Sequence, residues 1–300
     1  MHYVVAVPLD KDLADFIGKK GSVNGITFYN RKQDDNTIVA LAPTSLEEKF
    51  YSVAEAMLIA DQIVLSTANV DKSFGEMLIA CSLLGKHTII TKDNDVNNLL
   101  ANGTMRDYEL VDRQGVVDRI LAFKPQAEQK GTRVDVDKAF PVKGIGTVAL
   151  GIVKSGRVRV HDKLKHTSGK DVEVRSMQSQ DVDIGEAEYG TRVGIALKGI
   201  EHDEMDKGDL LASDKLGKAK VITAEITKSG FVNESVDQTK LYQLVLNFSY
   251  TNARLELDGK SARIHLEKPI SLAVGDKFLL IRAAVPRIFA SGIVTATESG

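Results

Sequence analysis

The sequence predicts three domains, a doubly wound α/β domain followed by two β-barrels. Short apolar runs alternate with amphipathic segments of helical period over residues 1–123, and a polar segment follows at 124–131. Beyond it, short runs of alternating polarity bounded by glycine fill the rest of the 300 residues. The run SDKLGK at 213–218 separates two all-β stretches of similar length. We therefore expect domains at 1–123, 132–214 and 215–300, with a linker at 124–131.

The strands of the first domain are predicted from continuous apolar runs, which are typical of parallel strands covered on both faces. These runs lie at 3–7, 38–42, 63–65 and 88–90, and a last strand is expected near 108–111. The segments 25–29 and 37–42 flank a polar stretch at 30–36, which indicates a hairpin rather than a helical crossover. The expected sheet therefore has six strands, one of them an antiparallel edge strand.

Two longer helices are predicted between these strands. The segment 45–60 opens with Ser45 three residues before Glu48, which is the pattern of a capping box. The segment 71–84 carries an apolar stripe that includes Cys81 and stops at Gly85. This position favours core packing of Cys81 over a reactive thiol. Shorter helices are expected at 10–17, 95–100 and 116–121.

The strands of the two barrels are predicted from short alternating segments at regular spacing. In the first barrel they lie at 146–153, 157–160, 172–177 and 192–197. In the second barrel they lie at 221–227, 241–248, 262–266 and 278–281.

The composition is that of an ordinary folded protein, with 43% hydrophobic and 27% charged residues. The net charge of −2 divides into −5 over residues 1–128 and +3 over residues 129–300. A polyanion would therefore bind better to the second part, but +3 is too small to indicate a nucleic-acid partner by itself. No apolar run approaches the roughly 20 residues of a membrane helix, and no basic region precedes the apolar start, so we expect a cytoplasmic protein without a membrane partner. One cysteine and six histidines exclude a disulfide and a structural zinc cluster, and we expect no metal and no cofactor.

The order of domains resembles the layout of the translational GTPases, which implies a GTPase-like α/β domain. A phosphate-binding loop needs glycines between the first strand and the first helix, followed by Lys and Ser or Thr. The segment 7–12 instead reads VPLDKD, and no glycine occurs before Gly18. Pro8 lacks an N–H, and Asp10 puts a carboxylate at the helix N-terminus that a phosphate would occupy. The chain is thus expected to cap its own anion site.

Two further nucleotide motifs are absent from the sequence. The segment 42–45 reads APTS where a GTPase supplies an Asp for the metal and a Gly for the γ-phosphate. The segment 91–94 reads TKDN, in which only Lys92 matches the Asn-Lys-x-Asp run that reads guanine. We therefore expect a protein that neither binds nor hydrolyses GTP and is no enzyme. The alternative is a GTPase with an unconventional phosphate loop.

Three stretches of the second domain, at 136–164, 174–200 and 207–212, contain several spaced glycines. In these stretches the domain resembles the second domain of elongation factor Tu, and most of all that of SelB, the selenocysteine-specific elongation factor. The last domain is similar to the third domain of that family in size and strand rhythm. The whole chain resembles the shortened SelB-like proteins of archaea.

The resemblance implies a pocket on the second domain for the aminoacyl end of a tRNA. In the family, the Phe of the opening strand and the glycines that follow it help to form this pocket. The matching residues of this chain are Phe140, Gly144 and Gly146.

The resemblance also implies a group of charged residues beside that pocket. In SelB-type proteins an Asp followed by His or Arg, together with a later Arg in a Gly-x-Arg-Val turn, recognises the charged selenol. These positions hold Asp137, Lys138 and Arg192, so Lys138 keeps the charge but loses the planar donor. The residues themselves also allow an anion-reading site, because Asp137 can orient Lys138 or Arg192 as a cationic donor. The alternative is an ordinary ion pair at the rim.

Residues 154–160 read KSGRVRV, which predicts a strand with Arg157 and Arg159 on one face. Together with Lys154, these arginines are candidate contacts to RNA phosphates. The alternative is a solvated strand face.

The sequence thus predicts a translation-elongation-factor-like protein that works without GTP. Its barrels are expected to bind a tRNA or a ribosomal component, and no DNA partner is expected. Two alternatives remain open, a GTP-binding factor with an unconventional phosphate loop and a protein-interaction scaffold without an RNA role.

Overall fold

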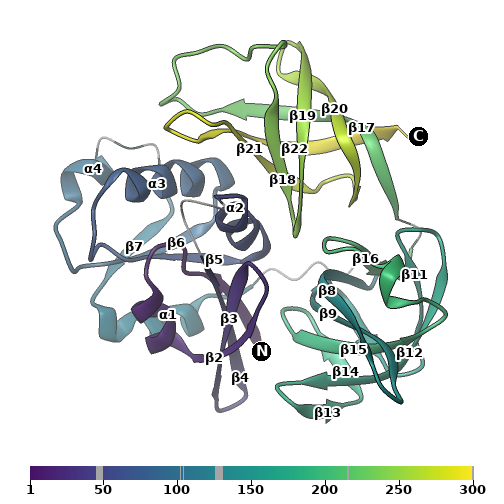
Figure 1. Cartoon of the computed structure of the whole chain (residues 1–300). Coiled ribbons are helices and arrows are strands. Elements are labelled where there is room, and N and C mark those ends of the chain that lie inside the picture. The colour runs from purple at the N-terminus through teal and green to yellow at the C-terminus, as the bar shows by residue number, and fades with distance from the viewer. Residues whose placement is uncertain (45–49, 102, 104, 126–130, 215, 299–300) are drawn as a thin grey trace.

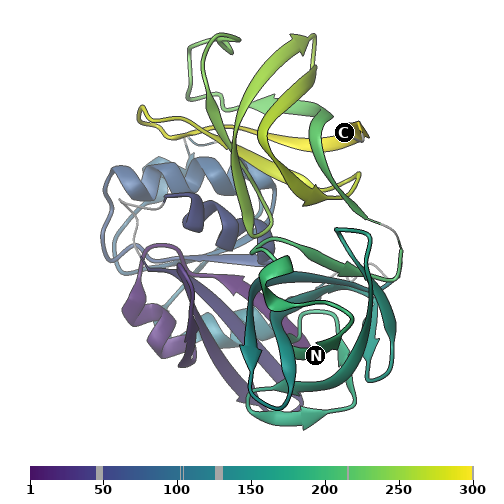
Figure 2. The same cartoon turned by 45° about the vertical axis from the view of Figure 1, so that its right-hand side comes forward.

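The computed structural model describes residues 1–44, 50–101, 103, 105–125, 131–214 and 216–298. An α/β domain at the N-terminus is followed by two barrels, and both barrels lie against the first domain (Figure 1 and Figure 2). The predicted fold class is therefore confirmed. No helix in the described ranges is long and apolar enough to cross a membrane.

The first domain is built on a seven-stranded sheet in the order β2-β3-β4-β1-β5-β6-β7. Strand β1 pairs in parallel with β4 and β5, and β6 and β7 continue the parallel part, whereas β3 runs antiparallel to both β4 and β2. The strands are β1 (His2–Ala6), β2 (Lys19–Val23), β3 (Ile26–Gln33), β4 (Asn36–Pro43), β5 (Gln62–Leu65), β6 (His87–Thr91) and β7 (Tyr108–Val111).

The sheet has seven strands instead of the six that were predicted, because the sequence analysis did not predict strand β2. The edge strand is β2, and the antiparallel strand β3 lies one position inside it. All five residues of β2, with the sequence KKGSV, are exposed. A strand without buried residues has no alternation of polarity, which is why the sequence gives no signal for it.

Helices cover both faces of this sheet. Helices α1 (Lys11–Ile17) and α5 (Val116–Ala122) pack on one face, and α2 (Phe50–Ile59) and α3 (Lys72–Leu84) on the other. The remaining helical segments are α4 (Asn97–Ala101) and η1 (Arg113–Gly115). Helix α3 ends as predicted at Gly85, whose φ of 60° is the left-handed conformation of a helix stop. The capping box predicted at Ser45 and Glu48 lies outside the described residues.

In the second domain six strands close in the order β11-β16-β8-β9-β15-β12, and β13 extends β12. Strands β10 and β14 form a separate ribbon beside them. The elements are β8 (Arg133–Val142), β9 (Gly146–Ser155), β10 (Arg157–Arg159), β11 (Lys163–His166), β12 (Asp171–Ser179), β13 (Val182–Ile184), β14 (Glu186–Glu188), β15 (Arg192–Lys198), η2 (His202–Glu204) and β16 (Leu210–Ala212).

The third domain is a closed barrel in the order β17-β20-β19-β18-β21-β22. Its strands are β17 (Gly217–Lys228), β18 (Tyr242–Leu246), β19 (Ser249–Asp258), β20 (Ser261–Leu272), β21 (Lys277–Ile281) and β22 (Ile288–Glu298).

The hydrophobic core of the first domain continues into both barrels. The buried cluster around α2 and α3 includes Ile152 of the second domain and Val245, Phe248 and Leu279 of the third. Helices α2 and α3, which cover this face of the sheet, are therefore themselves packed against the barrels.

Candidate functional site

The carboxyl ends of β1 and β5 form a cleft of about 290 Å³ in the first domain. The strand order reverses between these two strands, and open α/β sheets place their ligands at such a point. Asp10, Ser66 and Arg113 lie at this cleft.

Asp10 fills the amino end of α1. Its Oδ1 accepts the backbone N–H of Leu13 at 2.8 Å, and its Oδ2 accepts the hydroxyl of Ser66 at 2.6 Å. Arg113 of η1 donates to both carboxylate oxygens, at 3.0 and 3.3 Å. Burial alone would raise the pKa of Asp10, but the bonds from Ser66, Leu13 and Arg113 outweigh it and hold the pKa below its usual value. The predicted cap on this helix is thus present as an ionised carboxylate.

The segment 91–94 makes local structural contacts. The Thr91 hydroxyl donates to Asp93, and the Asn94 side chain donates to the Thr67 carbonyl at 2.7 Å. The second of these contacts joins the loops that follow β5 and β6 to each other. Among the described residues, no group of three or more His, Cys, Asp or Glu side chains is placed to hold a metal ion.

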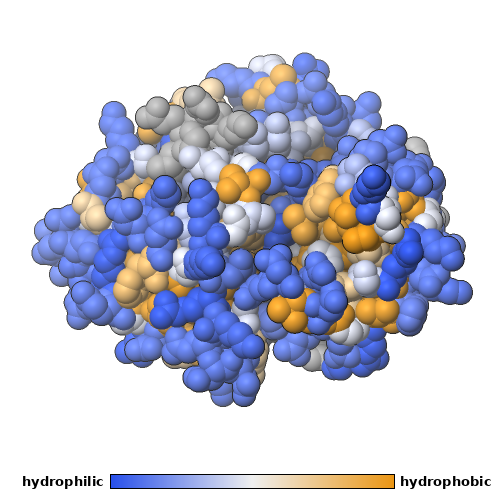
Figure 3. Space-filling model, turned by 60° about the horizontal axis from the view of Figure 1, so that its bottom comes forward, coloured by the Kyte–Doolittle hydropathy of each residue, from blue (hydrophilic) through white to orange (hydrophobic). Residues whose placement is uncertain are grey.

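A second cavity, of about 500 Å³, lies on the outer face of the second domain, and we call it the barrel groove. Strands β8, β9, β12 and β15 supply its walls, and the β2–β3 hairpin of the first domain closes one end. Hydrophobic side chains gather over the second domain in the view from below (Figure 3). The apolar lining residues are Phe140, Val142, Ile145, Val148, Leu150, Met177, Val193 and Ala196, and the polar ones are Ser22, Asn30, Ser176, Gln178, Gln180, Asp181 and Arg192.

Asp137 and Arg192 form a fork-shaped ion pair beside this groove. Arg192 donates to the two carboxylate oxygens of Asp137 at 2.5 and 2.9 Å. The side chain of Asp137 is 3% exposed and that of Arg192 is 10% exposed. The ring of Phe28, on β3 of the first domain, lies 3.9 Å from the guanidinium carbon of Arg192. The predicted orienting contact is present, and both charges are buried between two domains.

The other predicted pocket residues lie around the β8–β9 hairpin. Phe140 lines the barrel groove, and the exposed ammonium of Lys138 lies 5.7 Å from its ring centroid. Gly144 and Gly146, with φ of 80° and 102°, shape the turn on either side of Ile145, which also lines the groove. Neither glycine lines the groove itself.

The predicted RNA-phosphate residues do not form one face. Arg157 and Arg159 are exposed on β10, and both pair with Glu186 of β14, at 3.1 and 2.5 Å. Lys154 lies apart from them, on β9. Gly156, with φ of 58°, separates β9 from β10, so the side-chain alternation of one strand does not carry over to the other.

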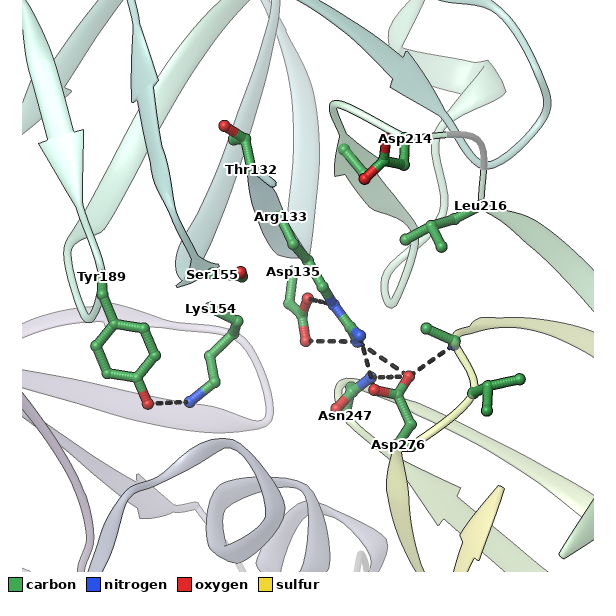
Figure 4. A pocket seen from close by; sticks show the side chains of 14 residues that line it. Thr132, Arg133, Asp135, Lys154, Ser155, Tyr189, Asp214, Leu216, Asn247 and Asp276 are labelled. Carbon is green, nitrogen blue, oxygen red and sulfur yellow. Dashed lines mark hydrogen bonds and ion pairs between the residues drawn. The ribbon is translucent and has the colours of Figure 1, made fainter. Parts of the chain in front are cut away.

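Lys154 connects the second domain to the first. Its ammonium donates to the Ile59 carbonyl at 2.7 Å and pairs with Asp61 at 3.2 Å, next to the Tyr189 hydroxyl (Figure 4). Burial alone would lower the pKa of Lys154, but the interactions with Asp61, Tyr189 and Asp135 together outweigh it and raise the pKa.

Sequence reasoning missed the contacts between the barrels. Arg133 lies between Asp135 of its own strand and Asp276 of the third domain, at 2.7 and 2.6 Å, beside a cavity of about 360 Å³ (Figure 4). No local pattern predicts a pair whose partners are separated by 143 residues.

Helix α2 contacts both other domains through polar and aromatic groups. Glu55 accepts from Lys207 of the second domain at 2.6 Å, and burial raises its pKa to about 7 against the opposing charge of Lys207. Tyr51 stacks on Tyr250 of the third domain with ring centroids 3.9 Å apart.

Comparison with known proteins identifies the family. Residues 146–212 match the family described as elongation factor Tu domain 2. Over 276 residues the chain is 31% identical to an uncharacterized protein of Methanocaldococcus jannaschii, a match that covers 88% of this chain and 90% of that protein. Over 163 residues it is 31% identical to the selenocysteine-specific elongation factor of Haemophilus influenzae. The chain belongs to the family of this Methanocaldococcus protein, and it is SelB-like and elongation factor Tu-like in the parts that match.

This SelB-like chain covers only part of its characterised relatives. The Haemophilus match includes 51% of this chain and 26% of that factor. The fold is that of SelB from Methanococcus maripaludis in its apo form, with a TM-score of 0.78 and 19% identity over 99% of this chain and 81% of that one.

Proposed function

We propose that this SelB-like chain acts in translation without GTP and binds the acceptor end of a tRNA in the barrel groove. The observation that carries the proposal is the position of this groove. Phe140 and Arg192, two of the residues that the family resemblance implies, line it, and the first domain closes its end. A ribosomal component is the other RNA partner that the same surface would fit.

The inference that GTP does not bind rests on Asp10. Its carboxylate stands at the amino end of α1, where a phosphate-binding loop would hold phosphate, and it is held there by Ser66 and Arg113. An incoming phosphate would meet a like charge in a partly buried site and would have to displace Arg113 from its partner. Without nucleotide there is no hydrolysis, so we propose no enzymatic activity.

The packing of α2 supports RNA binding that is not switched by a nucleotide. In GTPases the loss of the γ-phosphate releases switch segments. Here α2 follows β4, where a switch helix would stand, and it is held by Lys207 of the second domain and Tyr250 of the third. We infer that release of the RNA, where it is controlled, depends on a partner rather than on a nucleotide.

The barrel groove suits the end of a nucleic acid better than its backbone. Its walls are apolar, with serine and glutamine side chains among them. Such walls bind flat or apolar groups, and the polar side chains supply directed hydrogen bonds. Arg157 and Arg159 remain proposed phosphate contacts, although each shares its charge with Glu186.

The test is sequencing of the RNA that copurifies with the wild type and two variants. Leu150→Asp introduces a charge on the groove wall, and Leu241→Asp introduces the same charge at a site of the third domain that is 56% exposed. We expect tRNA to be enriched with the wild type and with Leu241→Asp, and to be lost from Leu150→Asp.

The same experiment separates the rival function. An RNA background that is equal in all three samples contradicts tRNA binding in the groove and favours a protein-interaction scaffold. The thermal unfolding midpoints of the three proteins show whether Leu150→Asp is folded in the preparation whose RNA is sequenced.

A further inference from the structure

An apolar cavity of about 320 Å³ lies between the first and third domains, and we call it the interdomain pocket. Helices α3 and α4 form one side, and the β17–β18 and β21–β22 loops form the other; the β21–β22 loop reaches over α3 (Figure 1). The pocket shares no lining residue with the barrel groove or with the cleft at Asp10. Its apolar walls include Leu78, Ile79, Leu100, Met105, Phe231 and Val285.

Large apolar side chains at this pocket are exposed to solvent. Leu99 of α4 is 48% exposed, and Phe231 and Val285 of the two loops are 50% and 60% exposed. A small molecule that filled the pocket would leave much of this surface in water, whereas a protein segment lying across the pocket would bury it. The exposure therefore favours a protein partner.

Gly75 leaves space at the wall that α3 provides. It lies within α3, where glycine is less favourable than alanine. A Cβ atom at Gly75 would meet no atom of the rest of the described chain within 4 Å. Packing within the described chain therefore does not require a glycine here, whereas a partner side chain that enters the pocket would use the space.

The one carboxylate among the described lining residues is neutralised. The side chain of Glu76 is 3% exposed, and it pairs with Arg287 at 2.6 Å. The ammonium of Lys72, which also lines the pocket, is exposed, and no ion pair is found for it among the residues that the structure describes. The pocket itself is therefore positively charged.

A second cation lies beside the pocket. Arg106 donates to the carbonyls of the lining residues Gly103 and Met105, at 3.2 and 3.3 Å, and pairs with no carboxylate in the described part of the chain. Its neighbour Asp107 pairs instead with His87 at 2.8 Å. Two cations without an acidic partner thus stand next to apolar walls.

The other acidic residues near the pocket have partners of their own. Asp71 and Asp95 accept backbone N–H groups at the amino ends of α3 and α4. Glu234, on the β17–β18 loop, pairs with Arg282 at 2.6 Å. The charge that Lys72 and Arg106 leave open is therefore available to an acidic partner.

We propose that the interdomain pocket binds an acidic amphipathic helix of a partner protein. The apolar face of that helix enters the pocket beside Gly75, and its carboxylates meet Lys72 and Arg106. Because helices and loops line the pocket, it offers no sheet edge to an added strand, whereas a helix satisfies its own backbone groups. The bound helix bridges the first and third domains. This proposal does not depend on RNA binding in the barrel groove.

The test uses three synthetic helical peptides of equal length. The first has leucine at positions i, i+3, i+4 and i+7, with glutamate and alanine elsewhere. In the second peptide lysine replaces glutamate, and in the third alanine replaces leucine. Fluorescence anisotropy of each labelled peptide with the full chain gives its dissociation constant. We expect micromolar binding of the first peptide and binding at least about tenfold weaker for the other two.

Two variants locate the binding. Gly75→Leu fills the pocket and should weaken the first peptide by about tenfold or more. Lys72→Glu reverses an exposed charge, so it should weaken the first peptide and strengthen the lysine peptide, and it serves where Gly75→Leu does not fold. The matched control is Gly185→Leu, which puts the same side chain at an open position of the second domain and should leave both affinities unchanged.

Several outcomes overturn the proposal. They are no binding of the first peptide, equal binding of the acidic and basic peptides, or affinities that neither variant changes. Binding of decanoate without binding of any peptide would assign the pocket to a small apolar acid instead. A dimer that sedimentation detects in the wild type and not in Gly75→Leu would assign it to a second copy of the chain.

Discussion

Arg113 and Asp10, which are 103 positions apart in the sequence, meet at the amino end of α1 with Nη1 and Oδ2 at 3.0 Å. The same carboxylate accepts the backbone N–H of Leu13 at 2.8 Å. A single side chain thus caps the helix and neutralises an arginine, and we propose that it also excludes a phosphate from this position.

Asp10→Ala should lower the free energy of unfolding by about 1 kcal/mol, the usual cost of losing a side-chain cap. Asp10→Asn should cost less, because asparagine also caps helices and only the ion pair with Arg113 is lost. Urea denaturation of the three proteins measures both differences. Equal stability of the wild type and Asp10→Ala would contradict the capping role.

The contribution of Asp10 depends on pH. Its pKa is lower in the folded chain, so its contribution is present above the unfolded value of about 4 and is lost as the pH falls through the folded value. The stability difference between the wild type and Asp10→Asn should therefore disappear on acidification. A difference that stays constant from neutral pH into this acid range would contradict the assigned contacts.

The contribution of Glu55 to the free energy of unfolding should have the opposite pH dependence. Its folded pKa of about 7 lies above the ordinary value, so its contribution to stability is present below the unfolded pKa and is lost as the pH rises through about 7. Between pH 4.5 and 7.5, wild-type stability should fall relative to Glu55→Gln by up to roughly 3 kcal/mol. Parallel pH profiles of the two proteins would exclude burial of an ionisable Glu55.

Lys154 should behave as a structural anchor. Lys154→Ala leaves the carboxylate of Asp61, whose side chain is 9% exposed, without its ammonium partner. The expected cost is about 3 kcal/mol of unfolding free energy. Arg157→Ala is the matched control, because Arg157 is exposed and pairs only at the surface. If both variants unfold at the wild-type midpoint, Lys154 is not an interdomain contact.

Local features of the structure were predictable from the sequence, and contacts between domains were not. The cap at Asp10 follows from residues three positions apart, and the stop of α3 follows from Gly85. The partner Arg113 is far away in the sequence, and no pattern points to it. The family resemblance singled out Asp137 and Arg192, because their spacing in the sequence does not by itself bring them together.

Contacts were not predicted correctly where the packing around a strand, and not its own sequence, decides what its side chains touch. Lys154 was grouped with Arg157 because the residues are neighbours in sequence, yet the turn at Gly156 separates two strands. Phe28 lies in a correctly predicted strand, but its position over Arg192 depends on how two domains pack. The fully exposed strand β2 carries no periodic signal at all.

Isothermal titration of the purified chain with GTP and with GDP tests the central claim most directly. With Asp10 and Arg113 in place, we predict no saturable heat for either nucleotide, which corresponds to dissociation constants weaker than about 1 mM. A micromolar dissociation constant for GTP or GDP would contradict the account.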